Sequence, residues 1–156
     1  MWTRRTFNKK EYSNPFERIK VDLKRLKIAT TATVATISDE HGLVSWKNYD
    51  KSINTDKFME YLTTLKKRFK NRRIAIFMDN LRVHHTLKVK DYCKRNDIQI
   101  IFNLAYYPDG NPIEVIFSKA KRLFKGLKTN EAVNGRSTKT TTLIDCSFAQ
   151  VTKQDC

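Results

Sequence analysis

Two short, largely apolar runs, IAIFM at 74–78 and IQIIF at 98–102, constrain the fold of this chain more than any other feature. Runs of this length and composition are typical of strands that are buried on both faces of a sheet. A helical pattern covers about 86–95 between them, and a second helix is expected from Pro112 to about Lys125. The order strand, helix, strand, helix predicts parallel strands joined by right-handed crossovers.

A β-hairpin and a helix are expected before the first of these strands. Residues 26–37 are rich in β-branched side chains and alanine, SDEHG is typical of a turn, and LVSWKNYD (43–50) fits the returning strand. Asn54 is a good helix N-cap, and apolar residues follow it at helical spacing: Phe58, Tyr61, Leu62, Leu65 and Phe69. The predicted fold class is therefore α/β, a mixed sheet in which an antiparallel hairpin is followed by βαβα, with helices on both faces.

The whole chain, residues 1–156, is expected to form a single domain. Its length suits one compact core, and the sequence contains neither an internal repeat nor a composition shift that would mark a second domain. Residues 126–141 are rich in Gly, Asn, Thr and Ser, which favours a loop. Residues 143–154 are expected to form a final helix, so 126–156 is predicted to be a loop followed by a C-terminal helix.

The chain carries 31 Lys and Arg against 16 Asp and Glu, a formal net charge of +15. Such an excess usually indicates a polyanionic partner, and nucleic acid is favoured over an anionic membrane surface. No run approaches the roughly 18 apolar residues that span a bilayer, and the N-terminal residues lack the apolar stretch of a secretory signal. The three cysteines show no CxxC spacing. We therefore expect an intracellular protein that is neither secreted nor bound to a membrane.

Each of two groups of cations has both a structural and a functional interpretation. The first crowds the end of the helix predicted after Asn54: Lys66, Lys67, Arg68, Lys70, Arg72 and Arg73. It complements the negative end of the helix dipole, or it contacts DNA or serves in nuclear targeting. The second group follows Glu114 along the next predicted helix: Lys119, Lys121, Arg122, Lys125 and Lys128. It is a solvated basic face, or it grips the DNA backbone.

Two acids, Asp79 and Glu114, are candidate metal ligands. Asp79 ends a buried strand, at the edge where open α/β sheets bind ligands, although it could instead cap a turn with Asn80. Glu114 follows Asn111 and Pro112 in a pattern that is also typical of a helix cap. Mg²⁺ prefers oxygen ligands, usually one or two carboxylates together with phosphate oxygens and water. Acids on different elements that converge at one sheet edge would suit phosphate chemistry.

At these residues the chain resembles Tc/mariner-type DDE transposases, including bacterial insertion-sequence relatives. The family pattern is a strand followed by Asp-Asn, a His five residues after that Asp, then Leu-Pro-x-Tyr-Ser-Pro-Asp-x-Asn-Pro-Ile-Glu, an aromatic residue and a later Lys. The following residues fit it: Asp79, Asn80, His84, Leu104, Tyr106, Pro108, Asp109, Asn111, Pro112, Ile113, Glu114, Phe117 and Lys121. The 34 residues between Asp79 and Glu114 match the gap between the family's second and third acids. The likeness covers roughly residues 26–125.

The resemblance implies an RNase H-like fold in which Asp79 and Glu114 are the second and third acids of a metal-binding triad. It implies Mg²⁺ as the cofactor, with Mn²⁺ as a substitute, and Asn80, His84 and Asn111 as residues that surround the acids. The family's reaction is phosphodiester hydrolysis at transposon ends, followed by attack of the freed 3′-hydroxyl on target DNA. Expected partners are double-stranded DNA and, in the full-length protein, a second copy. The expected location is the nucleus in a eukaryote or the cytoplasm in a bacterium.

The chain also departs from the family pattern. Ala105 replaces a Pro, Tyr107 replaces a Ser, and Gly110 stands where an apolar residue is typical. The family's first acid is expected on a strand before Trp2. The prediction is therefore a transposase core that is incomplete at its N-terminus, without that strand and without the helix-turn-helix region. Its catalysis is expected to be impaired. Asp39 imitates the first acid but falls in a predicted turn. The alternative function is a non-catalytic DNA-binding relic or adapted binder of the same fold.

Overall fold

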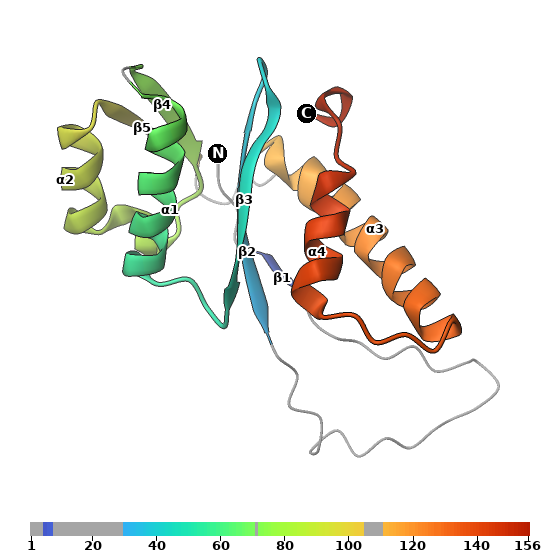
Figure 1. Cartoon of the computed structure of the whole chain (residues 1–156). Helices are drawn as coiled ribbons and strands as arrows, with labels where there is room; N and C mark the ends of the chain where they lie inside the picture. Colours follow the sequence, from blue (N-terminus) through green and yellow to red (C-terminus); the bar gives the residue numbers. More distant parts are fainter. Residues whose placement is uncertain (1–4, 8–29, 71, 105–110) are drawn as a thin grey trace.

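The computed structural model describes residues 5–7, 30–70, 72–104 and 111–156 (Figure 1). Three strands form an antiparallel sheet in the order β1 (Arg5–Phe7), β2 (Thr31–Ser38) and β3 (Gly42–Asp50). Two further strands, β4 (Ile74–Met78) and β5 (Ile98–Phe102), pair in parallel. The helices are α1 (Thr55–Arg68), α2 (Leu87–Arg95), α3 (Ile113–Val133) and α4 (Thr140–Ala149), with 3₁₀ turns η1 (Arg82–His85) and η3 (Lys153–Asp155). No helix among these residues is both long and apolar enough to cross a membrane.

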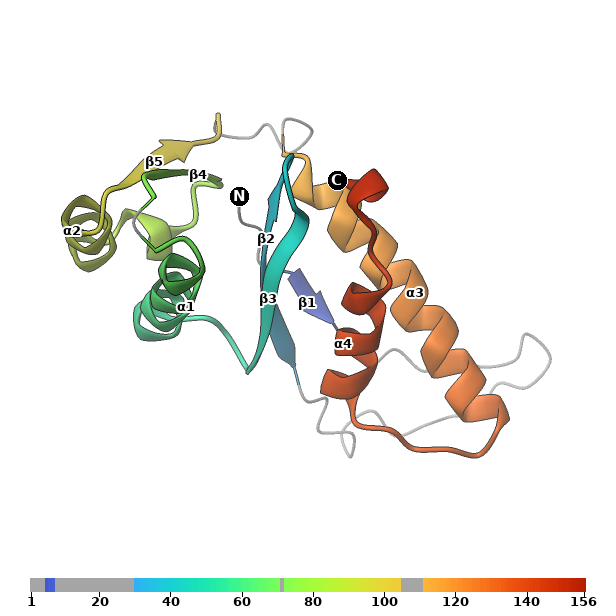
Figure 2. The same cartoon turned by 45° about the horizontal axis from the view of Figure 1, so that its top comes forward.

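The predicted fold class is confirmed: an antiparallel hairpin precedes a βαβα unit, and helices lie on both sides of the hairpin. The β2–β3 hairpin lies between α1 and the α3–α4 pair, an arrangement visible in both orientations (Figures 1 and 2). Within the described residues the two ladders are separate sheets rather than one hydrogen-bonded sheet. The prediction that β4 and β5 are buried on both faces is wrong, because Ala75 and Ile101 are exposed on one face of their two-stranded sheet. The architecture is RNase H-like.

Alternation along β2 divides the apolar residues into two cores. Ala32 and Val34 belong to the first core, together with residues of α1, α2, β4 and β5. Ala35 belongs to the second core, which α3 and α4 cover. Successive strand residues point to opposite faces, so one strand supplies both cores. A bulge at Val44 keeps this division where Thr36 pairs with Ser45 and Ile37 with Leu43.

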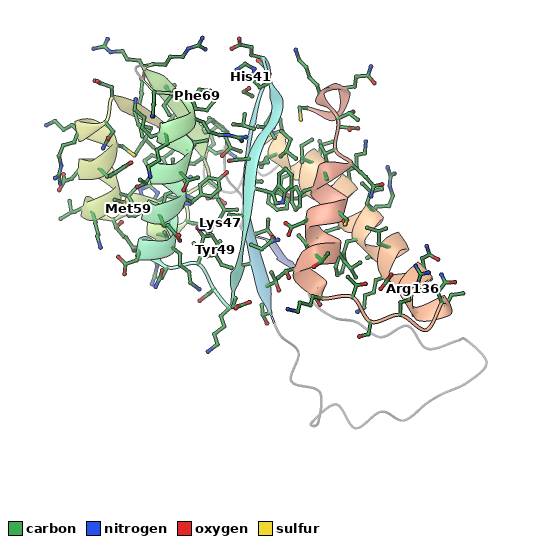
Figure 3. All side chains as sticks on the ribbon, in the orientation of Figure 1. His41, Lys47, Tyr49, Met59, Phe69 and Arg136 are labelled. Carbon is green, nitrogen blue, oxygen red and sulfur yellow. The ribbon has the colours of Figure 1, made fainter. Side chains whose placement is uncertain are left out.

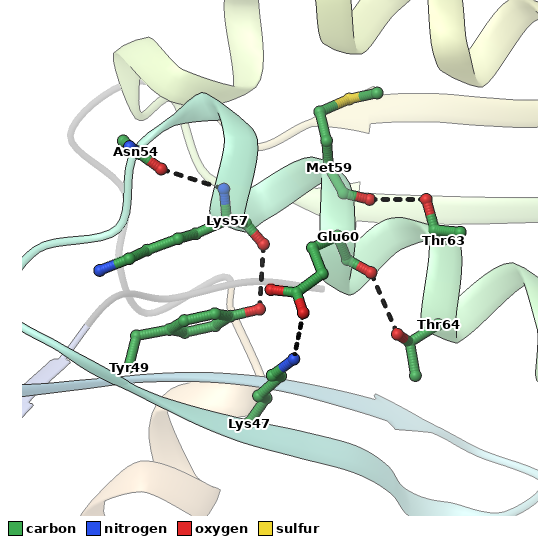
Figure 4. A network of polar contacts seen from close by, with 8 residues as sticks. All are labelled: Lys47, Tyr49, Asn54, Lys57, Met59, Glu60, Thr63 and Thr64. Atoms are coloured by element: carbon green, nitrogen blue, oxygen red, sulfur yellow. Dashed lines mark hydrogen bonds and ion pairs between the residues drawn. The ribbon is translucent and has the colours of Figure 1, made fainter.

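The helix predicted after Asn54 is confirmed and begins as expected. The Asn54 side chain accepts a hydrogen bond from Lys57 N at 3.0 Å, as an N-cap does. Figure 4 shows how α1 is tied to β3: Tyr49 Oη donates to Lys57 O at 3.0 Å, and Lys47 Nζ donates to Glu60 Oε1 at 2.7 Å. The hydrogen bond from Lys47 lowers the pKa of the Glu60 carboxyl.

The predicted loop over 126–141 is wrong for its first part, because α3 continues to Val133. Leu127 packs against the second core one turn after the buried Phe124, and this contact carries the helix past Gly126. Asn134 caps the end of the helix, and Gly135 follows it with a φ of +64°. Arg136 N donates to Glu131 O and Gly135 N donates to Ala132 O, which is the pattern of a Schellman end.

The final helix is confirmed as α4, although it begins three residues earlier than predicted and ends by Ala149. Asp145 Oδ1 accepts hydrogen bonds from Trp46 Nε1 and Asn48 Nδ2 of β3, both at 2.8 Å. The Trp46 ring stacks on Phe148, with centroids 5.8 Å apart. These contacts fix α4 against the hairpin.

Candidate active site

Asp79 directly follows β4, at the carboxyl end of the strand. Its side chain remains 26% exposed, which leaves the carboxylate accessible to a ligand. Leu81 N approaches Asp79 Oδ1 at 3.4 Å, near the outer limit for a hydrogen bond. The turn-capping alternative therefore has a weak geometric basis, and it does not consume the carboxylate.

His84 lies against Asp79 in the turn η1. Its Nδ1 is 3.0 Å from Asp79 Oδ1 and 3.0 Å from Asp79 O. Both neighbours of Nδ1 are acceptors, so Nδ1 carries the proton and donates. The imidazole is buried, and its centroid lies 4.5 Å from that of Phe58 in α1. Because packing holds the ring, His84 can fix the orientation of the Asp79 carboxylate.

Asn80 connects the ends of β4 and β5. Its Nδ2 donates to Asn103 O, and its Oδ1 lies 3.2 Å from His85 Nε2. The His85 ring stacks on Phe102 of β5, with centroids 4.1 Å apart. Sequence reasoning missed His85, Phe102 and Asn103, and only the adjacency of the two histidines hinted at the first of them.

Glu114 lies in the first turn of α3, next to Asn111 and Pro112. The predicted side-chain cap by Asn111 is wrong: Pro112 is the N-cap residue, and no side chain caps the helix there. Glu114 N instead donates to Asn111 O at 3.0 Å, which satisfies the amide that the side chain would have capped. Asn111 is 3% exposed, and its buried Oδ1 has no hydrogen-bond partner in the part of the chain that the structure describes.

The structure therefore places the predicted site residues in two groups. Asp79, Asn80 and His84 form one connected group at the end of β4, whereas Asn111 and Glu114 share the start of α3. Asp109 lies outside the described residues, as do the acids at 11, 17 and 22. Across ranges 30–70, 72–104 and 111–156, no group of three or more His, Cys, Asp or Glu side chains is arranged to hold a metal ion.

The donor atoms nevertheless suit a hard divalent cation. Asp79 and Glu114 supply carboxylate oxygens, and the buried Asn111 Oδ1 is an amide oxygen that has no hydrogen-bond donor among the described residues. A buried oxygen without a donor costs free energy unless a cation, water or another donor satisfies it. One or two carboxylates are a common protein contribution to a Mg²⁺ site.

The five cations predicted to bind DNA on α3 have different environments. Arg122 and Lys125 are exposed one turn apart and lie on the same face of the helix. Lys121 and Lys128 are half-buried. Lys119 donates to Asp155 of η3, and this hydrogen bond lowers the pKa of Asp155 to about 2. Arg122 and Lys125 are therefore the members best placed to meet a phosphate backbone.

Asp39 lies far from Asp79 and cannot join it at one metal. The Phe58–His84 ring contact places the beginning of α1 beside Asp79. The stacked His41 and Phe69 rings place the β2–β3 turn at the opposite end of that helix. The two ends are about 16 Å apart along the axis, counted from Phe58 to Phe69 at about 1.5 Å per residue.

Comparison with known proteins identifies the family. The model of the DDE superfamily endonucleases matches residues 3–133. The chain therefore belongs to the DDE superfamily endonucleases, and the resemblance of its Asp79 and Glu114 segments to this class is confirmed at the level of the family. No curated protein sequence matches the chain.

Solved structures share the fold at low sequence identity. A Mos1 strand transfer complex aligns with 98% of this chain at a TM-score of 0.64 and 16% identity. The catalytic domain of Mos1 transposase, with raltegravir and Mn, aligns with 81% of this chain and 66% of its own at 0.58 and 14%. The catalytic core domain of BIV integrase aligns with 79% of this chain and 74% of its own at 0.55 and 9%. The present chain covers 47% of the Mos1 chain in the strand transfer complex, about half its length.

Proposed function

We propose that this chain is the catalytic core of a Tc/mariner-type transposase, whose chemistry is metal-dependent cleavage of DNA phosphodiesters and strand transfer. Family membership supports the endonuclease class. The Mos1 structures of similar fold include a strand transfer complex and a paired-end complex with the left transposon end. The expected partner is accordingly double-stranded DNA, and the charge of +15 suits it.

The observation that carries the proposal is the setting of Asp79. A partly exposed carboxylate at the carboxyl end of the parallel strand β4 is held by a buried imidazole at 3.0 Å. A residue that only capped a turn would have no need of this second partner. Glu114 adds a carboxylate at the start of α3, beside an amide oxygen that has no donor among the described residues.

Mg²⁺ is the proposed cofactor, and the Mos1 catalytic-domain structures with Mn and with Mg are consistent with either ion. Asp79 and Glu114 would hold it, and Asn111 would contribute its side-chain oxygen. When bound, the ion supplies Lewis-acid stabilisation of charge on a phosphoryl group. The part of His84 is to hold the Asp79 carboxylate in one orientation, and that of Asn80 is to join the ends of β4 and β5.

A titration with Mn²⁺, followed by the loss of its free-ion electron paramagnetic resonance signal, tests the site. We expect Asp79→Asn and Glu114→Gln each to weaken Mn²⁺ binding by at least tenfold, about 1.4 kcal/mol. Asp91→Asn, at an exposed acid on α2, is the matched control and should leave binding unchanged. Equal binding by all four proteins would overturn the metal site.

A plasmid-nicking assay, combined with the Mn²⁺ titration, separates catalysis from the alternative, a non-catalytic DNA-binding relic or adapted binder. That alternative is favoured by the lack of a three-ligand group within the described ranges. We expect the isolated chain to show little or no Mg²⁺-dependent nicking of plasmid DNA, although it binds Mn²⁺. Strong nicking that disappears in Asp79→Ala would show that the catalytic site is complete. Tight DNA binding without any metal binding would favour the alternative.

A further inference from the structure

Eight cations gather at the edge of the β4–β5 sheet that is opposite Asp79, and we name this group the basic edge. Its members come from the end of α1, the connection to β4 and the end of α2: Lys66, Lys67, Arg68, Lys70, Arg72, Arg73, Lys94 and Arg95. The pairing of Ile74 with Ile98 brings the segments before the two strands together, and Ile74 N donates to Asp97 O at 3.3 Å. The basic edge is therefore a product of the fold and not only a run in the sequence.

The charges of the basic edge are not neutralised within the described structure. Every member except Lys66 is exposed, and none takes part in an ion pair between described residues. The acids on neighbouring segments are Asp97, which precedes β5, and Asp39 and Glu40 in the β2–β3 turn, where Glu40 lies 3.6 Å from His41. Helix-dipole complementarity accounts for the cations within the last turns of α1 and α2. It does not account for Lys70, Arg72 and Arg73, which lie beyond the end of α1.

Hydrogen bonds hold the described residues between α1 and β4 against the end of α1. Lys66 Nζ donates to Arg72 O at 2.8 Å, and Arg72 N donates to Phe69 O at 3.1 Å. Phe69 packs against the first core and stacks on His41, with centroids 6.3 Å apart (Figure 3). A nuclear-import receptor that reads an extended basic peptide would have to break these hydrogen bonds and expose Phe69. A phosphate backbone requires only cations presented on a surface.

We propose that the basic edge is a second contact surface for the phosphate backbone of duplex DNA, separate from the acids and from Arg122 and Lys125. This inference rests on the proposed function for its choice of partner. The five residues of β4 separate Arg73 from Asp79, so the two are six steps of extended chain apart, a span of about 20 Å. At about 3.4 Å per nucleotide along one strand, this span corresponds to about six nucleotides. The basic edge would thus hold DNA away from the phosphate at the acids.

Two double variants with equal loss of charge test the basic edge. The test variant is Lys70→Gln with Arg73→Gln, and the control is Arg136→Gln with Lys139→Gln, in the loop at the far end of α3 (Figure 3). All four residues are exposed, and each pair lowers the formal charge from +15 to +13. Fluorescence anisotropy with a labelled duplex is recorded over a salt series without metal, and thermal melting checks that both variants fold.

We expect the test variant to reduce the slope of log affinity against log salt by about 1.8, since each lost phosphate contact contributes about 0.9. The control variant should keep the slope of the original chain. A charge-retaining variant, Lys70→Arg with Arg73→Lys, should also keep it. Equal slopes for the test and control variants would overturn the inference. If the slopes were equal and the test variant also failed to accumulate in nuclei, the basic edge would be assigned to an import receptor instead of DNA. Mn²⁺ binding is measured separately, so failure of the metal site remains distinguishable.

Discussion

The two faces of the β2–β3 hairpin are covered in different ways. The first core joins α1, α2, β4 and β5, and it includes a buried polar group where Tyr61 Oη meets Thr36 Oγ1, Ser45 Oγ and Ser45 O. The second core, under α3 and α4, combines aliphatic side chains with aromatic contacts such as the edge-to-face pair of Phe117 and Phe148. The first core thus contains a hydrogen-bonded group among its apolar side chains, and the second contains stacked and edge-to-face rings among its own.

The two cores bear on the candidate site because Asp79 and Glu114 lie next to buried residues of different cores. Asp79 follows β4, whose Met78 is buried in the first core. Glu114 lies between Ile113 and Ile116, both fully buried in the second. The acids can share a cation only while both cores keep their positions against the hairpin. Changes confined to one core should therefore reveal which of them governs the alignment.

The largest effect is expected from Phe148→Ala in the second core. Phe148 is fully buried, stacks on Trp46 and meets Phe117 edge-on, so its removal leaves a large cavity. We expect a loss of about 3–5 kcal/mol in the free energy of unfolding, measured with urea. Val133→Ala, at an exposed apolar residue of α3, should change it by less than about 0.5 kcal/mol. A loss below 1 kcal/mol in Phe148→Ala would show that α4 does not hold the second core together.

A smaller effect is expected from Tyr61→Phe in the first core. The change keeps the ring but removes the partner of the buried Thr36 hydroxyl and of the half-buried Ser45 hydroxyl, which costs about 1–3 kcal/mol. Burial raises the pKa of Tyr61 from 10.0 to about 12. The folded state thus binds the phenol proton more tightly, and this stability is present below pH 10 and is lost as the pH rises through about 12.

Unfolding free energies measured from neutral pH to pH 12 check this assignment. The original chain should lose stability between pH 10 and 12, and Tyr61→Phe should lose less of it. Part of the loss should remain in the variant, because burial and the charge of Glu60 also raise the pKa of Tyr49. Identical pH profiles for the two proteins would mean that Tyr61 is not held in the first core as described.

The next comparison is between two asparagines that the sequence presents as equivalent helix caps. Asn54→Ala should cost about 1 kcal/mol, since it removes the hydrogen bond from Lys57 N. Asn111→Ala should cost little or be stabilising, because it removes a buried oxygen that has no partner in the described structure. Urea unfolding distinguishes them, and a loss of about 1 kcal/mol in Asn111→Ala would restore the capping role. If Asn111 contributes to the metal site, the same change should weaken Mn²⁺ binding.

These asparagines also show how far sequence reasoning reaches. Local signals predicted β2 to β5, α1 and α2, because hydrophobic period and capping residues act over a few positions, but they did not predict β1. The same rules failed at Gly126, where the packing of Phe124 and Leu127 in the second core keeps the chain helical. They failed at Asn111 because a backbone carbonyl was the better-placed acceptor. The contact of His84 with Asp79 is local in sequence, yet its orientation depends on Phe58 from α1.

The smallest effect separates two cations on the helix α3. Lys119 donates to Asp155, whereas Arg122 is exposed, so Lys119→Met should reduce DNA affinity less than Arg122→Met.

The hydrogen bond between Lys119 and Asp155 should also affect the stability of the protein at low pH. The pKa of Asp155 is lowered from 3.8 to about 2, mainly by the hydrogen bond from Lys119, so its contribution is present above pH 4 and is lost as the pH falls through about 2. The original chain should therefore lose more stability than Lys119→Met over this range of pH in thermal melting. If both variants weaken DNA binding equally and their acid profiles coincide, Lys119 contacts DNA directly, and η3 is not fastened to the second core through Asp155.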